Sequence, residues 1–173
     1  RPNMWGAHVS AVPNDQVARL TSIDTRAKVA YFGDFGYELD ITKLSAEEQE
    51  TIKQQVAFYK QYRPLFQFGT FYRLETPDTN ENVHGWEVVA KDKRQAIGAR
   101  FQILNGANPA YIRYYFTGLD PQLTYRVNDD QETYSGAELM KAGYFVPRVM
   151  DRTQPEKAPA DFYAHLFVVK AVD

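Results

Sequence analysis

The stretch GYELDITKLSAEEQETIKQQVAFYKQYR, residues 36–63, carries the clearest secondary-structure signals in the chain. Its first six residues, 36–41, form a candidate β-strand. Ser45 and Glu48 then match the pattern of a capping box, and the acids crowd the first helical turn while the bases lie in the last. Apolar residues recur at spacings of three and four, which places Ile52, Val56 and Tyr59 on one helical face. We predict a helix that begins after Ser45 and ends at Pro64.

The residues before this stretch repeat the same order of elements. MWGAHVS, residues 4–10, is a short apolar run that ends in a turn signal. Asp24 can cap a helix over 25–32, and Gly33 suits the position just after its end. Residues 1–66 are therefore predicted as strand, helix, strand and helix. Two such βα units place their strands in parallel, joined by right-handed crossovers.

From residue 67 onward the apolar period changes to two. IGARFQI, residues 97–103, alternates cleanly between an apolar and a polar face. Two further runs alternate likewise, at residues 86–90 and 112–116, and the segments 78–82 and 147–160 are predicted as loops. FYAHLFVVKAV, residues 162–172, is apolar at nearly every position, which is typical of a strand covered on both faces. Ser135 and Glu138 can cap one helical turn. We predict an antiparallel β-sandwich over 67–173.

Composition excludes several classes of protein. The formal net charge of −2 gives no field that would attract nucleic acid or an anionic membrane. No segment approaches the roughly 18 consecutive apolar residues of a membrane helix. Cysteine is absent, which excludes disulfides and thiolate chemistry and favours a reducing compartment. The three histidines, His8, His84 and His165, lack metal-ligand spacing, so neither a metal nor a cofactor is expected.

The two predicted parallel strands pose a packing problem. A parallel sheet needs both faces covered, and two strands alone do not form a stable sheet. We therefore expect further strands to come from elsewhere, either a missing N-terminal portion of the same polypeptide or a second copy.

Four segments closely resemble the C-terminal part of the bacterial α-galactosidases of glycoside hydrolase family 36. They are NMWGAHVSAVPNDQ (3–16), RAKVAYFGDFGYELDITKLS (26–45), QVAFYKQYRPLFQFGTFYRL (55–74) and YSGAELMKAGY (134–144). The resemblance covers nearly the whole chain, with the segments in the expected order. It implies a fold of the α/β plus all-β class, with the last two βα units of a (β/α)8 barrel over 1–66 and the C-terminal antiparallel β-sandwich over 67–173. Residues 4–10 would be the seventh barrel strand and 36–40 the eighth.

The resemblance also implies an activity that this chain does not carry alone. Family members hydrolyse terminal α-linked galactose by a retaining mechanism that uses two Asp residues. The nucleophile belongs to a Lys-Trp-Asp type motif that is absent here, and the acid/base lies before the first segment, so we assign no catalytic residue. The implied parent is a bacterial cytoplasmic enzyme, commonly a homo-oligomer, that acts on melibiose- or raffinose-type sugars and contributes the missing N-terminal portion.

Two residues near the start of the chain are candidates for the rim of the substrate pocket. If residues 4–10 are a barrel strand, Trp5 could be a wall of the sugar site and His8 a polar group beside it. Alternatively, Trp5 packs in the core and His8 orders the following loop through hydrogen bonds, which we weigh more heavily. Glu38 and Asp40, two apart on a predicted strand, should share one face in the barrel interior or mouth, although structural roles are favoured for them and for Asp34.

Our first hypothesis is that the chain is a portion of an enzyme and that it completes and supports a barrel. Two other functions are alternatives to it. The chain could be a carbohydrate-binding module with Trp86, Tyr111 and Tyr115 as stacking platforms, or an oligomerisation module. The 12 Tyr, 11 Phe and 2 Trp residues fit either a core-filling role or sugar stacking.

Overall fold

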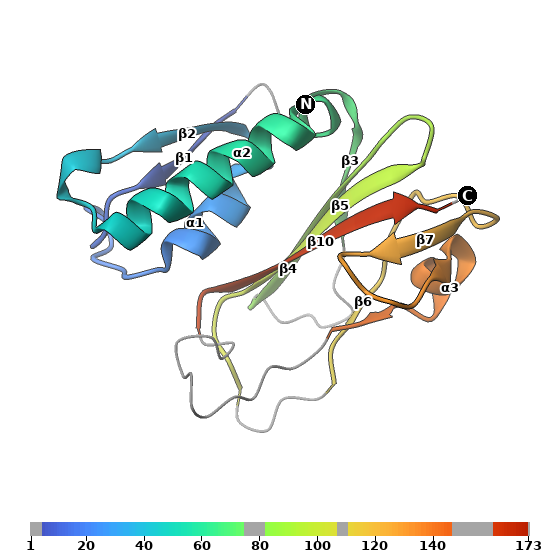
Figure 1. The fold of residues 1–173 in the computed structure, drawn as a ribbon. Coiled ribbons are helices and arrows are strands. Elements are labelled where there is room, and N and C mark those ends of the chain that lie inside the picture. The colour runs from blue at the N-terminus through green and yellow to red at the C-terminus, as the bar shows by residue number, and fades with distance from the viewer. Residues whose placement is uncertain (1–4, 75–81, 107–110, 147–160, 173) are drawn as a thin grey trace. The chain divides into compact units, whose positions relative to one another are not determined.

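The computed structural model describes residues 5–74, 82–106, 111–146 and 161–172. The chain divides into two compact units, Arg1–Gly69 and Thr70–Asp173, shown in Figure 1. The loop predicted at 147–160 lies outside the described residues, as does all but Asn82 of the loop predicted at 78–82.

The first unit has the predicted order of strand, helix, strand and helix. Its elements are β1 (Gly6–Ser10), α1 (Ile23–Ala30), β2 (Asp34–Glu38), a short 3-10 helix (Ile41–Lys43) and α2 (Ala46–Phe68). Strands β1 and β2 pair in parallel, with a register that runs from Gly6 opposite Asp34 to Ser10 opposite Glu38. The prediction of parallel strands is therefore confirmed.

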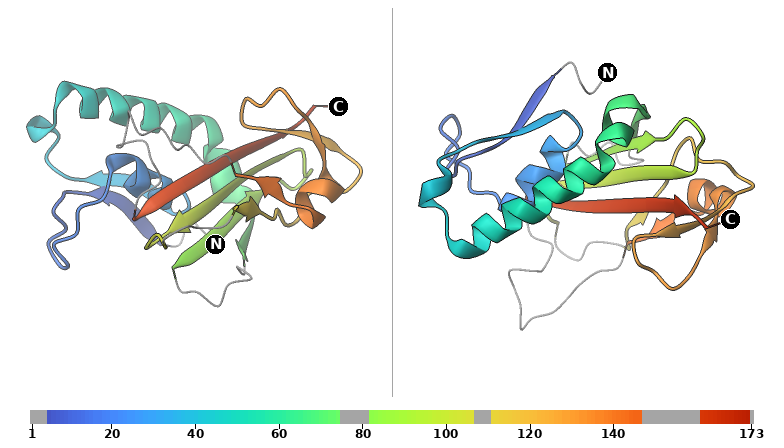
Figure 2. Two further views of the ribbon diagram at one scale, coloured as in Figure 1. Left: turned by 90° about the horizontal axis from the view of Figure 1, so that it is seen from below. Right: turned by 45° about the horizontal axis from the view of Figure 1, so that its top comes forward.

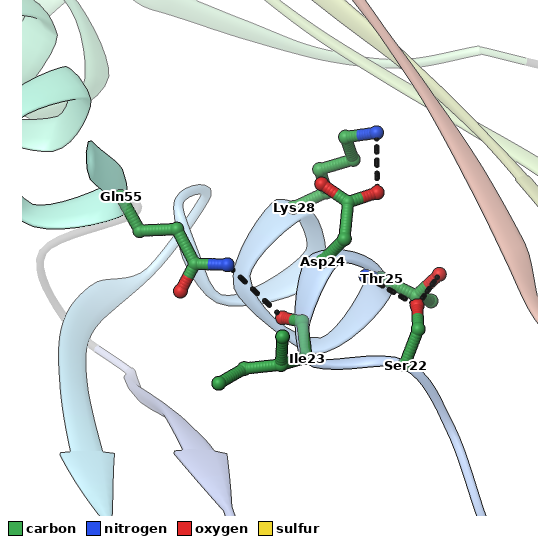
Figure 3. Close-up of polar contacts among 6 residues, drawn as sticks. All are labelled: Ser22, Ile23, Asp24, Thr25, Lys28 and Gln55. Atoms are coloured by element: carbon green, nitrogen blue, oxygen red, sulfur yellow. Dashed lines mark hydrogen bonds and ion pairs between the residues drawn. The ribbon is translucent and has the colours of Figure 1, made fainter. Parts of the chain in front are cut away.

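The N-terminus of α2 is built as the sequence predicts, whereas that of α1 is not. Ser45 Oγ accepts from the Glu48 N–H at 3.1 Å, and the Glu48 carboxylate accepts from the Ser45 N–H at 2.9 Å. For α1 the cap is Ser22, whose Oγ accepts from the Thr25 N–H at 3.0 Å (Figure 3). The predicted cap, Asp24, lies in the first turn and pairs with Lys28 at 2.6 Å. Both residues suit a cap chemically, but Ser22 has the extended backbone that the position needs.

The prediction that Pro64 ends the second helix is wrong, because α2 continues to Phe68. Pro64 removes one hydrogen-bond donor from the helix. The turn that follows buries Leu65 and Phe66, and the Phe66 ring lies 5.3 Å from the ring of Phe32. The helix ends at Gly69, whose N–H donates to the Leu65 carbonyl at 2.8 Å. Burial of two large apolar side chains thus outweighs one lost backbone bond.

Both helices contact the same face of the β1–β2 pair. The ring of Phe35 in β2 lies 5.0 Å from Tyr31, just after α1, and 4.8 Å from Tyr59 in α2. Buried Gln55 links all three layers: its Oε1 accepts from the Tyr37 hydroxyl at 2.8 Å, and its Nε2 donates to the Ile23 carbonyl at 3.3 Å (Figure 3). The helix-facing side of the strands is therefore a closed aromatic core.

The second unit is built on a six-stranded antiparallel sheet with the strand order β3-β4-β5-β10-β7-β8. The strands are β3 (Thr70–Leu74), β4 (Val83–Val89), β5 (Gln95–Gln102), β7 (Thr124–Val127), β8 (Tyr134–Ser135) and β10 (Tyr163–Ala171). Figures 1 and 2 show β10, in red, running between β5 and β7. This central place accounts for its apolar sequence, because β10 has buried side chains on both faces: Ala164 is buried on one face, and Phe167 and Val169 are buried on the opposite face.

A second layer covers that face of the sheet. It contains the two-stranded ribbon of β6 (Arg113–Tyr114) and β9 (Tyr144–Phe145), and helix α3 (Gly136–Lys141), which Ser135 caps as predicted. The strand predicted over 112–116 is thus shorter than expected. Tyr114 and Phe167 pack with their ring centroids 4.6 Å apart, inside one apolar cluster. An antiparallel sheet with a second layer packed on one face is consistent with the predicted β-sandwich.

One carboxyl group lies inside this cluster. Glu87 of β4 has an exposed fraction of 0%, and its Oε2 accepts from the Thr117 N–H at 2.8 Å. Among the described residues its Oε1 has no hydrogen-bond partner. Burial holds the pKa of Glu87 well above the ordinary range of a glutamate, so the protonated form is favoured in the fold. Glu87 therefore fastens the segment at Thr117 to the sheet.

The alternating sequence of β5 predicted one apolar and one polar face, and the packing at Gly98 shows why this prediction was misleading. Gly98 falls on the face predicted to be polar, but the Tyr114 ring lies directly over it. A methyl group on Gly98 would come within 2.5 Å of the Tyr114 hydroxyl, which donates to the Trp86 carbonyl at 2.8 Å. β5 is therefore buried on both faces at this point.

We predict that Gly33→Ala destabilises the first unit. Gly33 lies between α1 and β2, where a methyl group would be 2.6 Å from the Cβ of Ala7 and 3.0 Å from the Trp5 carbonyl oxygen. We expect a loss of about 1–3 kcal/mol in the free energy of unfolding, measured by urea denaturation. Gly6→Ala is the matched control, because nothing lies within 4 Å of its added methyl group. Equal effects of the two substitutions would contradict the close approach.

We also predict that Glu87→Gln changes the pH dependence of stability. The raised pKa of folded Glu87 means that its stabilising contribution is complete below the unfolded pKa and is lost as the pH rises toward the folded pKa. The wild-type chain should therefore lose up to about 1.4 kcal/mol per pH unit above about pH 4.5 relative to Glu87→Gln, which cannot ionise. Urea denaturation between pH 5 and pH 8 measures this difference.

The control for that experiment is Glu132→Gln, which alters an exposed carboxylate of the same unit. Its unfolding free energy should follow that of the wild type across the pH range. If Glu87→Gln also runs parallel to the wild type, Glu87 is not held in its neutral form.

Candidate functional site

The face of the β1–β2 pair that points away from the helices carries small and polar side chains. Because residues alternate along a strand, His8 and Glu38 project opposite to Val9, Phe35 and Tyr37. Gly36 lies directly opposite His8 in the register. A methyl group at Gly6 or at Gly36 would have nothing within 4 Å. This open face is the candidate functional site of the chain.

His8 and Glu38 are brought together on that face. The distance between His8 Nε2 and Glu38 Oε2 is 2.5 Å, and the two side chains are 50% and 73% exposed. Glu38 lies opposite Ser10, so the His8 imidazole reaches diagonally across the pair, over Gly36, to meet the carboxylate. Recognising the pair from sequence requires the parallel register, which no local pattern gives.

Arg26 in α1 fixes the end of β1, a role that the sequence alone did not reveal. Its guanidinium donates to the carbonyl oxygens of Ser10 and Thr21. Burial lowers the pKa of Arg26, and the nearby Glu48 carboxylate opposes that effect. In the loop that follows β1, the Asn14 side chain accepts from the N–H groups of Gln16 and Val17, both at 3.1 Å. Arg26 and Asn14 therefore make the loop-ordering contacts that were expected of His8.

The three acidic residues of the second strand region are separated. Asp34 begins β2, and its N–H donates to the Trp5 carbonyl at 2.9 Å. Glu38 ends the strand. Asp40 lies beyond it and caps the short 3-10 helix, accepting from the Thr42 N–H at 3.0 Å and from the Thr42 hydroxyl at 2.6 Å. These hydrogen bonds lower the pKa of Asp40. The expectation that Glu38 and Asp40 share a strand face is wrong, because the strand ends between them.

Trp5 does not lie beside His8. It precedes the first residue of β1, at the amino end of the strand, whereas Ser10 and Glu38 mark the carboxyl ends. The alternative expectation, that Trp5 packs in the core, is not met in this structure, where Trp5 is 42% exposed.

Other candidate chemistry is sparse in the described part of the chain. It contains no group of three or more His, Asp or Glu residues that could hold a metal ion. No helix in the described ranges is long and apolar enough to cross a membrane. Of the proposed stacking residues, Trp86 packs against Phe101, with ring centroids 4.8 Å apart, whereas Tyr111 is 86% exposed. Trp86 is therefore not an open platform.

Two family models match the chain, and they fall in different units. The Melibiase model matches residues 1–69, which is the whole first unit. The model of the glycosyl hydrolase family 36 C-terminal domain matches residues 83–169, within the second unit.

Curated relatives are similar along nearly the whole chain. Alpha-galactosidase AgaA of Geobacillus stearothermophilus is 45% identical over 167 residues, which is 96% of this chain and 21% of the relative. Alpha-galactosidase Mel36A of Lactobacillus acidophilus is 36% identical over 171 residues, which is 99% of this chain and 22% of the relative. The chain thus spans about a fifth of the length of these relatives.

Solved structures give the same result. The alpha-galactosidase of Lactobacillus brevis superposes with a TM-score of 0.89 at 56% identity, over 97% of this chain and 22% of that protein. AgaA of Geobacillus stearothermophilus, solved in complex with raffinose, gives a TM-score of 0.85 at 44% identity over 96% of this chain and 22% of that protein. With a family model that covers half of its length and relatives that agree along the remainder, this chain belongs to glycosyl hydrolase family 36.

Proposed function

We propose that this chain is the C-terminal part of an α-galactosidase that releases terminal α-linked galactose from melibiose- or raffinose-type sugars. The observation that carries the proposal is the similarity to alpha-galactosidases over 96% of the chain, at 45% identity. Both units take part in this similarity, so it does not rest on one shared module.

In the proposed enzyme, the first unit supplies the last two βα units of a (β/α)8 barrel. Two features support this assignment. Strands β1 and β2 are parallel, and α1 and α2 cover only one of their faces. In such a barrel the helices form the outer ring and the opposite face of each strand lines the interior. The open face with His8 and Glu38 would then point inward, and the second unit would support the barrel as a β-sandwich.

The chemistry requires residues from outside this chain. A retaining glycosidase uses two carboxylates about 5–5.5 Å apart, one as the nucleophile and the other as the acid and then the base. Of the carboxylates near the open face, Glu38 contacts His8 and Asp40 caps the short 3-10 helix. Both catalytic Asp residues would come from the preceding part of the enzyme. The chain would act within it as a structural part.

His8 remains our candidate for the rim of the sugar site. Active sites of this fold lie at the carboxyl ends of the strands. The His8 side chain contacts Glu38, the last residue of β2, and therefore lies near that end. Trp5 precedes β1 at its amino end, so we restrict the proposal to His8. A bacterial cytoplasmic location and homo-oligomers, as the family resemblance implies, belong to the same proposal.

A non-catalytic carbohydrate-binding role is the second candidate. Tyr111 is 86% exposed, and its ring lies 5.6 Å from that of Phe145, which is 44% exposed. Exposed aromatic rings can stack on sugar faces. The two rings are tilted by 49°, so they do not form a flat platform, and we rank this role below the first.

We predict that the purified 173-residue chain does not turn over a chromogenic α-galactoside, whereas the intact enzyme that contains it does. The reason is that neither catalytic carboxylate belongs to the chain. Release of nitrophenol is the measurement, with the uncatalysed reaction as the baseline. Hydrolysis by the chain alone would show that its own carboxylates are catalytic, and an inactive intact protein would refute the proposed substrate.

Melting temperatures with galactose or melibiose separate the two candidates. A ligand that binds the native chain stabilises it. We expect no shift for the isolated chain if it is only a structural part. A shift that Tyr111→Ala abolishes would instead support the carbohydrate-binding role.

A further inference from the structure

The pairing of His8 with Glu38 leaves part of the imidazole available for a ligand. With Nε2 engaged by the Glu38 carboxylate at 2.5 Å, the proton on that nitrogen is held in place. The other ring nitrogen, Nδ1, has no hydrogen-bond partner among the described residues. A carboxylate that holds the proton on one imidazole nitrogen fixes the tautomer and the orientation of the ring, so the second nitrogen is a hydrogen-bond acceptor.

The surroundings of the pair favour a hydroxyl-rich, uncharged ligand. Gly6 and Gly36 flank His8 without side chains, and nothing lies within 4 Å of where a methyl group would stand on either. With the proton on Nε2, the Nδ1 atom of His8 is an acceptor, and the carboxylate oxygens of Glu38 are acceptors as well. Sugar hydroxyl groups can donate and accept hydrogen bonds, so they match the His8–Glu38 pair better than an anion or an apolar group does.

We propose that His8 and Glu38 form a sugar-hydroxyl-binding wall at the carboxyl ends of β1 and β2, in which His8 contacts the sugar and Glu38 is the positioning residue. This inference rests on the proposed function, because it needs the open face to line a sugar site. It goes further by assigning a role to Glu38 and to its register with His8.

The test uses the intact enzyme with the substitutions Glu38→Gln, His8→Ala and His8→Gln. The matched control is Glu50→Gln in α2, where an exposed carboxylate is 3.0 Å from Lys53 Nζ on the outer surface of the helix. Kinetics on a chromogenic α-galactoside and calorimetric binding of galactose are the two measurements. Calorimetry also counts the binding-competent molecules, so a variant that fails to fold lowers the stoichiometry rather than the affinity.

The wall should act on binding more than on the chemical step. We expect Glu38→Gln and His8→Ala to raise KM and the galactose Kd about tenfold, with kcat within about threefold of the wild type. His8→Gln, which keeps an amide donor and an acceptor, should recover most of the loss. Glu50→Gln should match the wild type in every constant.

The outcomes separate this inference from the proposed function. An active wild type whose Glu38→Gln and His8→Ala variants stay within twofold of Glu50→Gln in KM and Kd overturns the binding wall alone. A similar loss in His8→Gln and His8→Ala, without rescue, also overturns it, because the hydrogen-bonding role would then be absent. An intact protein without α-galactosidase activity removes the proposed function and this inference together.

Discussion

Helices α1 and α2 pack on one face of the β1–β2 pair. This one-sided contact determines which side chains of the two strands are in the core and which lie on the open face. Phe35 and Tyr37 meet Tyr31, Tyr59 and Gln55 in a closed core on the helix side. The other face carries glycines and the His8–Glu38 pair, and among residues 5–69 nothing lies within 4 Å of a methyl group placed on Gly6 or Gly36. A two-stranded parallel pair is marginal by itself, which supports our proposal that it belongs to a larger parallel barrel.

The second unit buries its apolar side chains between its own sheet and its own second layer. Its six-stranded sheet places the apolar strand β10 between β5 and β7, and the β6–β9 ribbon with α3 covers one face. Even its buried carboxyl group, Glu87, has a structural use, since it accepts from the Thr117 N–H inside the core. The two units therefore differ in kind: the second is built on a sheet of six strands, whereas the first has only two parallel strands with helices on one face.

Local signals in the sequence predicted those parts of the fold that local chemistry determines. The Ser45–Glu48 capping box, the Ser135 cap and the parallel order of the first unit are examples. Errors arose where distant residues decide. Burial of Phe66 carries α2 past Pro64, and backbone geometry chooses Ser22 over Asp24 as a cap. His8 and Glu38 were both named from the sequence, but their pairing was not, because it depends on a strand register that sequence periodicity does not contain.

The central claim is that β1 and β2 need additional strands, whereas the second unit does not. Residue-resolved hydrogen exchange on the isolated 173-residue chain tests this claim most directly. The account predicts that amides of β5 and β10 exchange at least about a hundredfold more slowly than those of β1 and β2. Equal protection of the two sets would contradict it, because the parallel pair would then be stable with only one face covered.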